Sequence, residues 1–151
     1  MTDRRFWWTV TLGALTVVGL PVLGTWSRRN RLPRCDLDGA AIEPIYAVDV
    51  VDAQGKDHEF CCVLCAEFWL KRQTQPPREV RVVDEVTGRA IAAEAAFYVR
   101  STIVTNRATG NRVHVFRERT DAQVHASTRG GKLLTDAARP FGGDDPASDA
   151  Q

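Results

Sequence analysis

Residues 57–73 have the sequence DHEFCCVLCAEFWLKRQ, which joins a short strand directly to a helix. The first five residues are predicted to complete a hairpin. The segment from Cys62 to Gln73 contains no glycine or proline and is predicted to be helical. Because the same stretch carries Cys61, Cys62 and Cys65, this junction concentrates three thiols within five residues.

The flanking sequence extends the junction into a β-β-α-β unit. Upstream, I-Y-A-V-D-V-V-D is typical of a strand, and the glycine-containing segment after it is typical of a turn. Downstream, Pro76 and Pro77 end the helix before the apolar run E-V-R-V-V. The predicted elements are a strand at 45–52, a turn at 53–56, a strand at 57–61, a helix at 62–73 and a strand at 79–83.

The same order recurs in the second half of the chain. The segment T-D-A-Q, which starts at Thr120, is typical of a capping box in which Gln123 reaches back to the helix start. The predicted elements are a strand at 95–104, a turn at 106–111, a strand at 112–117, a helix at 120–128 and a strand at 132–134. The sequence therefore predicts an α+β fold, with tandem β-β-α-β repeats in one compact domain after an N-terminal transmembrane helix.

That transmembrane helix is predicted at residues 6–26, which contain no charged residue and are long enough to cross a bilayer. No A-x-A cleavage site is present, so we expect an anchor or an uncleaved signal. The chain then divides into a short flank at 1–5, the anchor at 6–26, a basic linker at 27–34, a metal-binding domain at 35–140 and a disordered tail at 141–151.

The four cysteines suggest a site for a thiophilic metal ion. Cys35 lies 26 residues before Cys61, and the C-x-x-C and C-x-x-x-C spacings bring the other sulfurs within chelating reach. Thiolates select Cu(I), which we favour, or Zn(II). The start of a helix is also expected to lower thiol pKa values. His58, three residues before Cys61, is a candidate supplementary ligand.

Other polar residues give little support for catalysis or for nucleic-acid binding. The net charge of the 151 residues is +1, and no basic stripe is interleaved with aromatic residues. Asp84 and Glu85 fit a solvated strand end, and His114 and His125 are expected to be exposed or hydrogen-bonded imidazoles. We therefore expect a binding protein rather than an enzyme.

Several segments together resemble the NosL family of copper-binding accessory proteins for nitrous oxide reductase maturation. They are Cys35 after a membrane segment, D-A-Q-G-K, F-C-C-V-L-C-A-E-F-W-L, V-R-V-V-D-E-V-T-G-R, A-E-A-A-F-Y-V-R-S, and F-R-E-R-T-D-A-Q with the later G-G-K-L-L. The resemblance covers roughly residues 35–134. It implies a tandem β-β-α-β fold, Cu(I) binding and delivery of copper to a partner enzyme outside the cytoplasmic membrane.

The chain also departs from this family. Cys35 alone is carried over from the cysteine-bearing N-terminal motif; here Asp36 and Leu37 follow it, and no lipid-attachment motif is visible. Met1 is the only methionine, so thioether ligation is excluded. Four arginines after Trp26 favour a cytoplasmic domain by the positive-inside rule, whereas the family resemblance favours the periplasmic face, which we adopt.

Three functional hypotheses follow. The first is a single-pass, membrane-anchored Cu(I) chaperone that passes its ion to a metalloenzyme or metal transporter. The second is a thiol-disulfide oxidoreductase that uses Cys62 and Cys65, and the third is an interaction domain stabilised by Zn(II). A structural disulfide, or cysteines that are simply buried apolar residues, is the remaining alternative.

Overall fold

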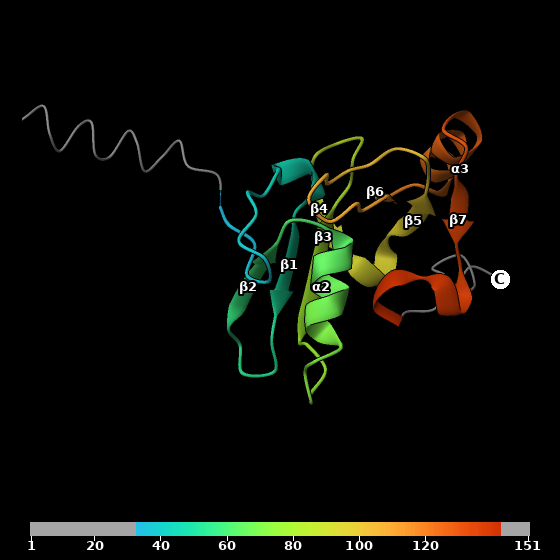
Figure 1. Ribbon diagram of the computed structural model, residues 1–151. Coiled ribbons are helices and arrows are strands. Elements are labelled where there is room, and N and C mark those ends of the chain that lie inside the picture. Colours follow the sequence, from blue (N-terminus) through green and yellow to red (C-terminus); the bar gives the residue numbers. More distant parts are fainter. Residues whose placement is uncertain (1–32, 143–151) are drawn as a thin grey trace, which may run out of the picture. The chain divides into compact units, whose positions relative to one another are not determined.

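The computed structural model describes residues 33–142 (Figure 1). The predicted segments 1–5 and 6–26, most of the linker 27–34 and most of the tail 141–151 lie outside this range. Within 33–142, no helix has the length and apolar character needed to cross a membrane.

The first half of the described domain is an antiparallel sheet that packs against helix α2. Its strands follow the order β2-β1-β3-β4, and each neighbouring pair is antiparallel. The elements are the 3-10 helix Pro44–Tyr46, β1 (Val48–Val51), β2 (Asp57–Phe60), α2 (Val63–Leu70), β3 (Glu79–Val83) and β4 (Ala90–Ala92).

The second half forms a separate antiparallel sheet, in the order β6-β5-β7, with helix α3 against it. The elements are the 3-10 helix Ala93–Ala95, β5 (Phe97–Arg100), β6 (Val113–Phe116), α3 (Arg119–Thr128), β7 (Lys132–Leu134) and the 3-10 helices Asp136–Ala138 and Pro140–Gly142. Figure 1 shows the two sheets beside each other, with α2 and α3 in different halves.

Both halves repeat one pairing scheme. The first strand is central, its hairpin partner lies on one side, and the strand that follows the helix lies on the other. The predicted order β-β-α-β is therefore present twice. Strand β4 is an addition that the sequence did not predict, because Ile91 is its only strong strand former.

The ends of several predicted elements were wrong. The strand predicted at 95–104 spans only Phe97–Arg100, and the helix predicted at 62–73 spans Val63–Leu70. The predicted strand 45–52 begins only at Val48, because a 3-10 turn with Pro44 at its start occupies the preceding residues. Helix α3 begins at Arg119, one residue after Glu118, and the cap makes no side-chain hydrogen bond. Thr120 thus lies inside the helix, and the capping box does not form.

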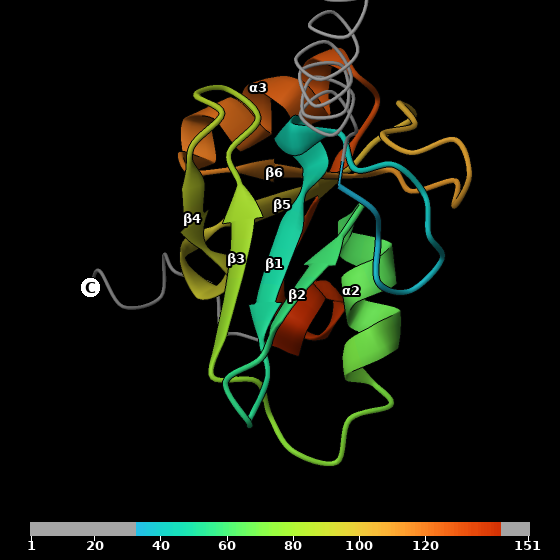
Figure 2. The ribbon, with the colours of Figure 1, turned by 90° about the vertical axis from the view of Figure 1, so that its left-hand side faces the viewer.

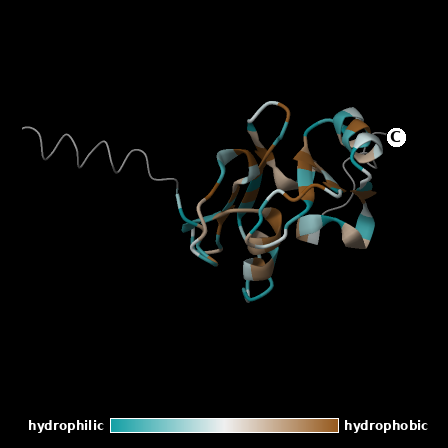
Figure 3. Cartoon of the chain, turned by 45° about the horizontal axis from the view of Figure 1, so that its top comes forward, coloured by the Kyte–Doolittle hydropathy of each residue, from teal (hydrophilic) through white to brown (hydrophobic). Residues whose placement is uncertain are grey.

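Buried residues from both halves make one continuous hydrophobic core. It joins Val48 and Phe60 of the first sheet to Tyr98 and Val115 of the second, and it includes all four cysteines. The buried Tyr98 hydroxyl donates a 2.8 Å hydrogen bond to the Ala93 carbonyl. Figure 3 shows that α2 is more hydrophobic than α3, in keeping with the position of α2 at this core.

Two loops meet the N-terminal end of α2 (Figure 2). One is the segment 33–42, drawn in blue and cyan, and the other is the segment 101–112, drawn in gold. A contact of 3.5 Å between Cys62 Sγ and Thr109 Oγ1 joins the second loop to the start of the helix. The fold therefore gathers both loops around the cysteine-bearing junction.

Candidate metal centre

The strand-to-helix junction sets the positions of three thiols. Cys61 follows Phe60, the last residue of β2, and Cys62 is the N-terminal cap of α2, with extended backbone angles. Cys65 lies in the first turn of the helix, on the face that is buried with Val63. All four cysteines of the chain are free thiols, and each is 3% exposed or less.

Three of these thiols and one carboxylate form a compact group. The ligand atoms of Cys35, Asp38, Cys61 and Cys65 all lie within 4.8 Å of one another. Cys61 Sγ and Cys65 Sγ are 3.5 Å apart, and an Asp38 oxygen lies 3.6 Å from Cys65 Sγ. Asp38 is the exposed member of this group, which we call the Cys3Asp group.

The dimensions of the Cys3Asp group suit a thiophilic ion. A tetrahedral ion with metal–sulfur bonds of about 2.3 Å needs donors about 3.8 Å apart. The observed separations bracket that value, so small side-chain movements are enough to close the group around one ion. Three thiolates favour Cu(I) or Zn(II), and the fourth donor, a carboxylate, is also an accepted Zn(II) ligand.

The loop that carries Cys35 and Asp38 is held by its own hydrogen bonds. The Cys35 N–H donates to the Ala40 carbonyl at 2.9 Å, and the Ala40 N–H donates to Asp38 Oδ1 at 3.0 Å. Gly39 has a φ of +71°, which permits this tight turn. The loop thus presents the Asp38 carboxylate to the thiols. Sequence reasoning missed Asp38, because only the folded loop brings it beside Cys65.

Burial dominates the acid–base properties of the metal-free group. It raises the pKa of Cys61 and of Cys65 well above the ordinary thiol value, and the neighbouring Cys62 adds to both effects. The expected lowering of the thiol pKa by the helix start is therefore wrong for these residues. Burial also acts to raise the pKa of Asp38, but hydrogen bonds from the Ala40 N–H and from nearby thiols outweigh it and lower that pKa. Metal binding must therefore release thiol protons.

Cys62 has a polar partner outside the Cys3Asp group, on the loop 101–112. Its Sγ lies 3.9 Å from Cys61 Sγ and 3.5 Å from Thr109 Oγ1, and it is not a member of the Cys3Asp group. Cys62 thus lies next to the Cys3Asp group, in contact with Cys61, without being one of its four members.

His58 also lies outside the Cys3Asp group. Its Nδ1 lies 2.8 Å from an Asp36 carboxylate oxygen, its Nε2 lies 3.2 Å from Asp52, and its ring packs 4.4 Å from the Trp69 ring. Both ring nitrogens thus have carboxylate partners. Since Asp36 adjoins Cys35, this arrangement ties the loop of the metal group to strand β2.

Of the two residues predicted at a solvated strand end, Asp84 is instead buried and Glu85 is half-buried. Asp84 is 2% exposed, and its carboxylate accepts hydrogen bonds from the N–H groups of Val86, Thr87 and Arg117. Burial acts to raise the pKa of Asp84, but these bonds and the Thr87 hydroxyl bond together lower it. The prediction that Asp84 is solvated was wrong, because the residue that donates to it through its N–H, Arg117, lies 33 residues later in the chain and gives no local signal.

The remaining two histidines form a second polar cluster. Glu85 lies 2.9 Å from His114 Nδ1 and accepts a hydrogen bond from the Val115 N–H at 3.0 Å. The buried His114 ring packs 4.2 Å from the ring of His125, whose Nε2 lies 3.3 Å from Ser101 Oγ. This cluster connects the loop after β3 to strand β6, which makes it an anchor between the two halves.

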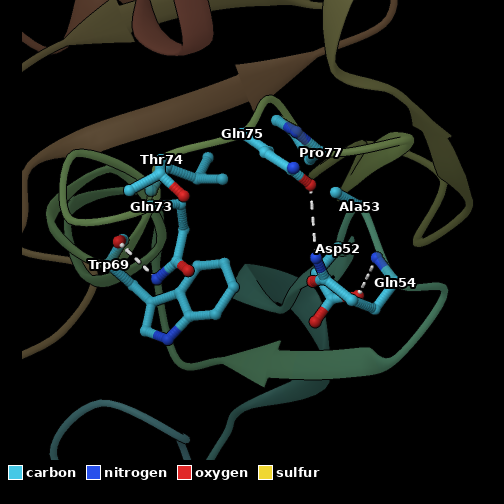
Figure 4. Close-up of a pocket in the computed structure, with 9 residues that line it drawn as sticks. Asp52, Ala53, Gln54, Trp69, Gln73, Thr74, Gln75 and Pro77 are labelled. Atoms are coloured by element: carbon cyan, nitrogen blue, oxygen red, sulfur yellow. Dashed lines mark hydrogen bonds between the residues drawn. The ribbon is translucent and has the colours of Figure 1, made fainter.

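A small hollow beneath Trp69 is separate from the Cys3Asp group (Figure 4). It has a volume of about 50 Å³, and the side chains of Gln54 and Gln75 meet across it at 3.2 Å. Such a volume holds only a few water molecules. The hollow is therefore no rival to the thiols as a functional site.

Comparisons with known proteins bear on the fold. No family model matches the chain, and no curated protein matches its sequence. A crystal structure described as the copper chaperone NosL from Shewanella denitrificans matches with a TM-score of 0.60 and 22% sequence identity. The match covers 69% of this chain and 87% of that chain. This chain has a NosL-like fold. The NosL-like domain thus combines the predicted tandem repeat with a buried group of three thiols and a carboxylate.

Proposed function

We propose that the NosL-like domain is a metallochaperone that binds one Cu(I) ion through Cys35, Cys61 and Cys65 and passes it on by ligand exchange. The observation that carries this proposal is the convergence of three buried thiols from separate elements within 4.8 Å of one another. The similarity to a crystal structure described as a copper chaperone also supports this proposal.

Binding rather than catalysis fits this arrangement. A catalytic thiol is normally activated by a lowered pKa, whereas burial raises the pKa of Cys61 and of Cys65. Inside the group, Cys61 Sγ lies 3.5 Å from Cys65 Sγ, and these two residues are not the C-x-x-C pair of a thioredoxin-like motif. The oxidoreductase hypothesis therefore has less support.

A zinc-stabilised interaction domain is the second candidate, because Asp38 supplies the fourth donor that Zn(II) commonly takes. The two candidates differ in what happens without metal. The hydrophobic core joins both sheets through residues such as Val48 and Tyr98, so a chaperone domain is expected to stay folded when metal-free. A structural zinc domain is expected to unfold when its ion is removed.

Anaerobic titration tests the proposal. The wild-type protein is titrated with Cu(I) against a competing chelator, and with Zn(II) in parallel. A variant with serine at Cys61, Cys62 and Cys65 serves as the comparison. We expect one Cu(I) per chain, with affinity weakened by several orders of magnitude in the variant, because serine hydroxyls are poor ligands for soft metals. Equal affinity in the two proteins rejects the cysteine group as the site.

We also propose that residues 6–26 anchor the domain to the cytoplasmic membrane, on its extracytoplasmic side, where a metalloenzyme or transporter receives the ion. The uncharged segment and the family resemblance support this location, while the arginines that follow Trp26 oppose it. A phosphatase reporter fused to the C-terminus is expected to be active, since that enzyme needs disulfides to fold. If the phosphatase fusion is inactive and a reporter that fluoresces in the cytosol is active at the same junction, the domain lies on the cytoplasmic side of the membrane.

A further inference from the structure

A cleft of about 410 Å³ lies beside the Cys3Asp group, and Cys61 forms part of its wall. Its two sides come from the segments 40–46 and 104–108, which are far apart in sequence. The volume falls near the lower end of the range for small-molecule sites. The cleft is thus large enough for one small ligand or for a side chain of a partner protein.

The side formed by residues 104–108 is fixed by hydrogen bonds. The Thr105 N–H donates to the Asn111 carbonyl at 2.8 Å, and Asn111 Nδ2 donates back to Thr105 Oγ1 at 2.6 Å. The Asn106 carboxamide oxygen accepts the N–H groups of Ala108 and Thr109. This wall is therefore ordered before any ligand arrives.

The opposite side is held in a similar way. The Ile42 N–H donates to the Pro33 carbonyl at 2.9 Å, and Arg34 and Ala41 form an isolated antiparallel bridge. Because the same loop carries Cys35, the bonds that fix this wall also fix part of the metal group. A preformed cleft costs a ligand little reorganisation.

The lining explains what the cleft admits. Ala40, Ala41 and Ala108 have short side chains, which leave the space open, and Glu43 and Arg107 are exposed residues of opposite charge. The lining therefore carries no strong net charge that selects an anion or a cation. The residue that distinguishes this cleft is Cys61, which is only 2% exposed and also belongs to the Cys3Asp group, where its thiol is a prospective Cu(I) ligand.

We infer that the cleft admits an incoming thiol to Cu(I) at Cys61 and is the route by which the metal is exchanged. This inference rests on the proposed function. The incoming thiol ionises, its thiolate donates an electron pair to Cu(I), and the bond from Cu(I) to Cys61 breaks. Cys61 leaves as a thiolate and takes up a proton, so that no atom changes oxidation state.

Tryptophan substitutions that fill the cleft test this route. Ala108→Trp and Ala41→Trp change exposed residues on opposite walls, and Ala137→Trp changes an exposed alanine that does not line the cleft. The assay follows Cu(I) transfer from each loaded protein to a fixed, low concentration of a chromogenic chelator. Glutathione is added in increasing amounts in one arm, and an unstructured peptide with one cysteine in the other. The slope of rate against thiol concentration measures thiol-assisted exchange.

Filling the cleft is expected to reduce the glutathione slope by about tenfold or more, as when a pocket rejects a ligand that does not fit. The equilibrium affinity for Cu(I) should stay within about threefold of wild type, or about 0.7 kcal/mol. The Ala137→Trp protein should match wild type. A reduced slope for glutathione alone identifies a low-molecular-weight thiol as the occupant, and a reduced slope for both thiols extends the route to protein cysteines.

Unchanged slopes in both cleft variants overturn the inference. An affinity loss that accounts for the whole change in slope in both variants also overturns it, because the substitutions then act on the metal group itself. A failure of the proposed chaperone function can be distinguished from a failure of the cleft route. If the chaperone proposal is wrong, the wild-type protein binds no Cu(I) in the chelator titration, and no transfer can be measured.

Discussion

Cys62 and Cys65 lie three residues apart, yet the structure gives them different surroundings, which makes their serine variants a matched pair. Cys65 Sγ lies 3.5 Å from Cys61 Sγ inside the Cys3Asp group. Cys62 Sγ contacts Thr109 Oγ1. Both residues are buried, so the two substitutions place a hydroxyl in equally dry surroundings. We predict that Cys65→Ser weakens Cu(I) binding far more than Cys62→Ser does.

The size of the difference follows from the position of each sulfur. Changes to groups outside a metal's ligand shell typically cost about 10-fold to 100-fold in affinity. Loss of a direct thiolate should exceed that range, so we expect Cys65→Ser to cost more than about 100-fold, or about 2.8 kcal/mol. Cys62→Ser should cost about tenfold, the lower end of that range, because Cys62 is not one of the four donors. Its hydroxyl keeps Thr109 as a hydrogen-bond partner, so the loss of folding stability should be about 1 kcal/mol.

Chelator competition measures the two affinities, and urea unfolding of the metal-free proteins measures their stability. The stability measurement is the control, because it separates a damaged fold from a lost ligand. An affinity for Cu(I) that falls as far in Cys62→Ser as in Cys65→Ser refutes the assignment of these two sulfurs. It indicates instead that the pair acts as a C-x-x-C chelate.

Three further predictions concern the surroundings of the site and the link between the halves. Asp38→Asn should weaken Zn(II) binding more than Cu(I) binding in parallel titrations, because the carboxylate suits the harder ion; an equal loss for both ions contradicts this role. Asp84→Asn should lower the free energy of unfolding, measured in urea, by about 2–4 kcal/mol, because the amide NH2 that replaces one carboxylate oxygen cannot accept the hydrogen bonds that Thr87 donates. An unchanged free energy of unfolding contradicts a stabilising role for these bonds. Burial and the neighbouring His114 lower the pKa of His125 below its usual 6.5. The imidazole of His125 therefore binds a proton more readily in the unfolded chain than in the folded protein, and the stability of the fold should decrease as the pH drops through about 6.5. The fall in melting temperature should be smaller in His125→Asn, and an identical pH profile counts against this explanation.

The repeated element order was predictable from the sequence, because it depends on local patterns. Alternating apolar residues define β3 at Glu79–Val83 and β6 around His114, and the paired prolines after α2 separate helix from strand. The short strand Lys132–Leu134 was also predicted with its observed bounds, since Gly130 and Gly131 precede it.

The site was predictable only in part. Local spacing brought Cys61 and Cys65 together, but the place of Cys35 depends on a loop that packs against β2 through the Asp36 N–H and the Glu59 carbonyl. Asp38 carries no sequence signal of its own, because carboxylates in short loops are common. The burial of Asp84 likewise depends on contacts with residues that come much later in the chain.

X-ray absorption spectroscopy of the Cu(I)-loaded protein counts the atoms bound to the metal, so it tests whether three thiolates hold the ion. We expect a shell of three sulfur atoms at about 2.3 Å from the ion. The shell should lose sulfur in the Cys35→Ser, Cys61→Ser and Cys65→Ser proteins, but keep all three sulfur atoms in Cys62→Ser. A shell dominated by nitrogen or oxygen atoms, or an unchanged sulfur shell after Cys65→Ser, shows that these three cysteines do not form the site.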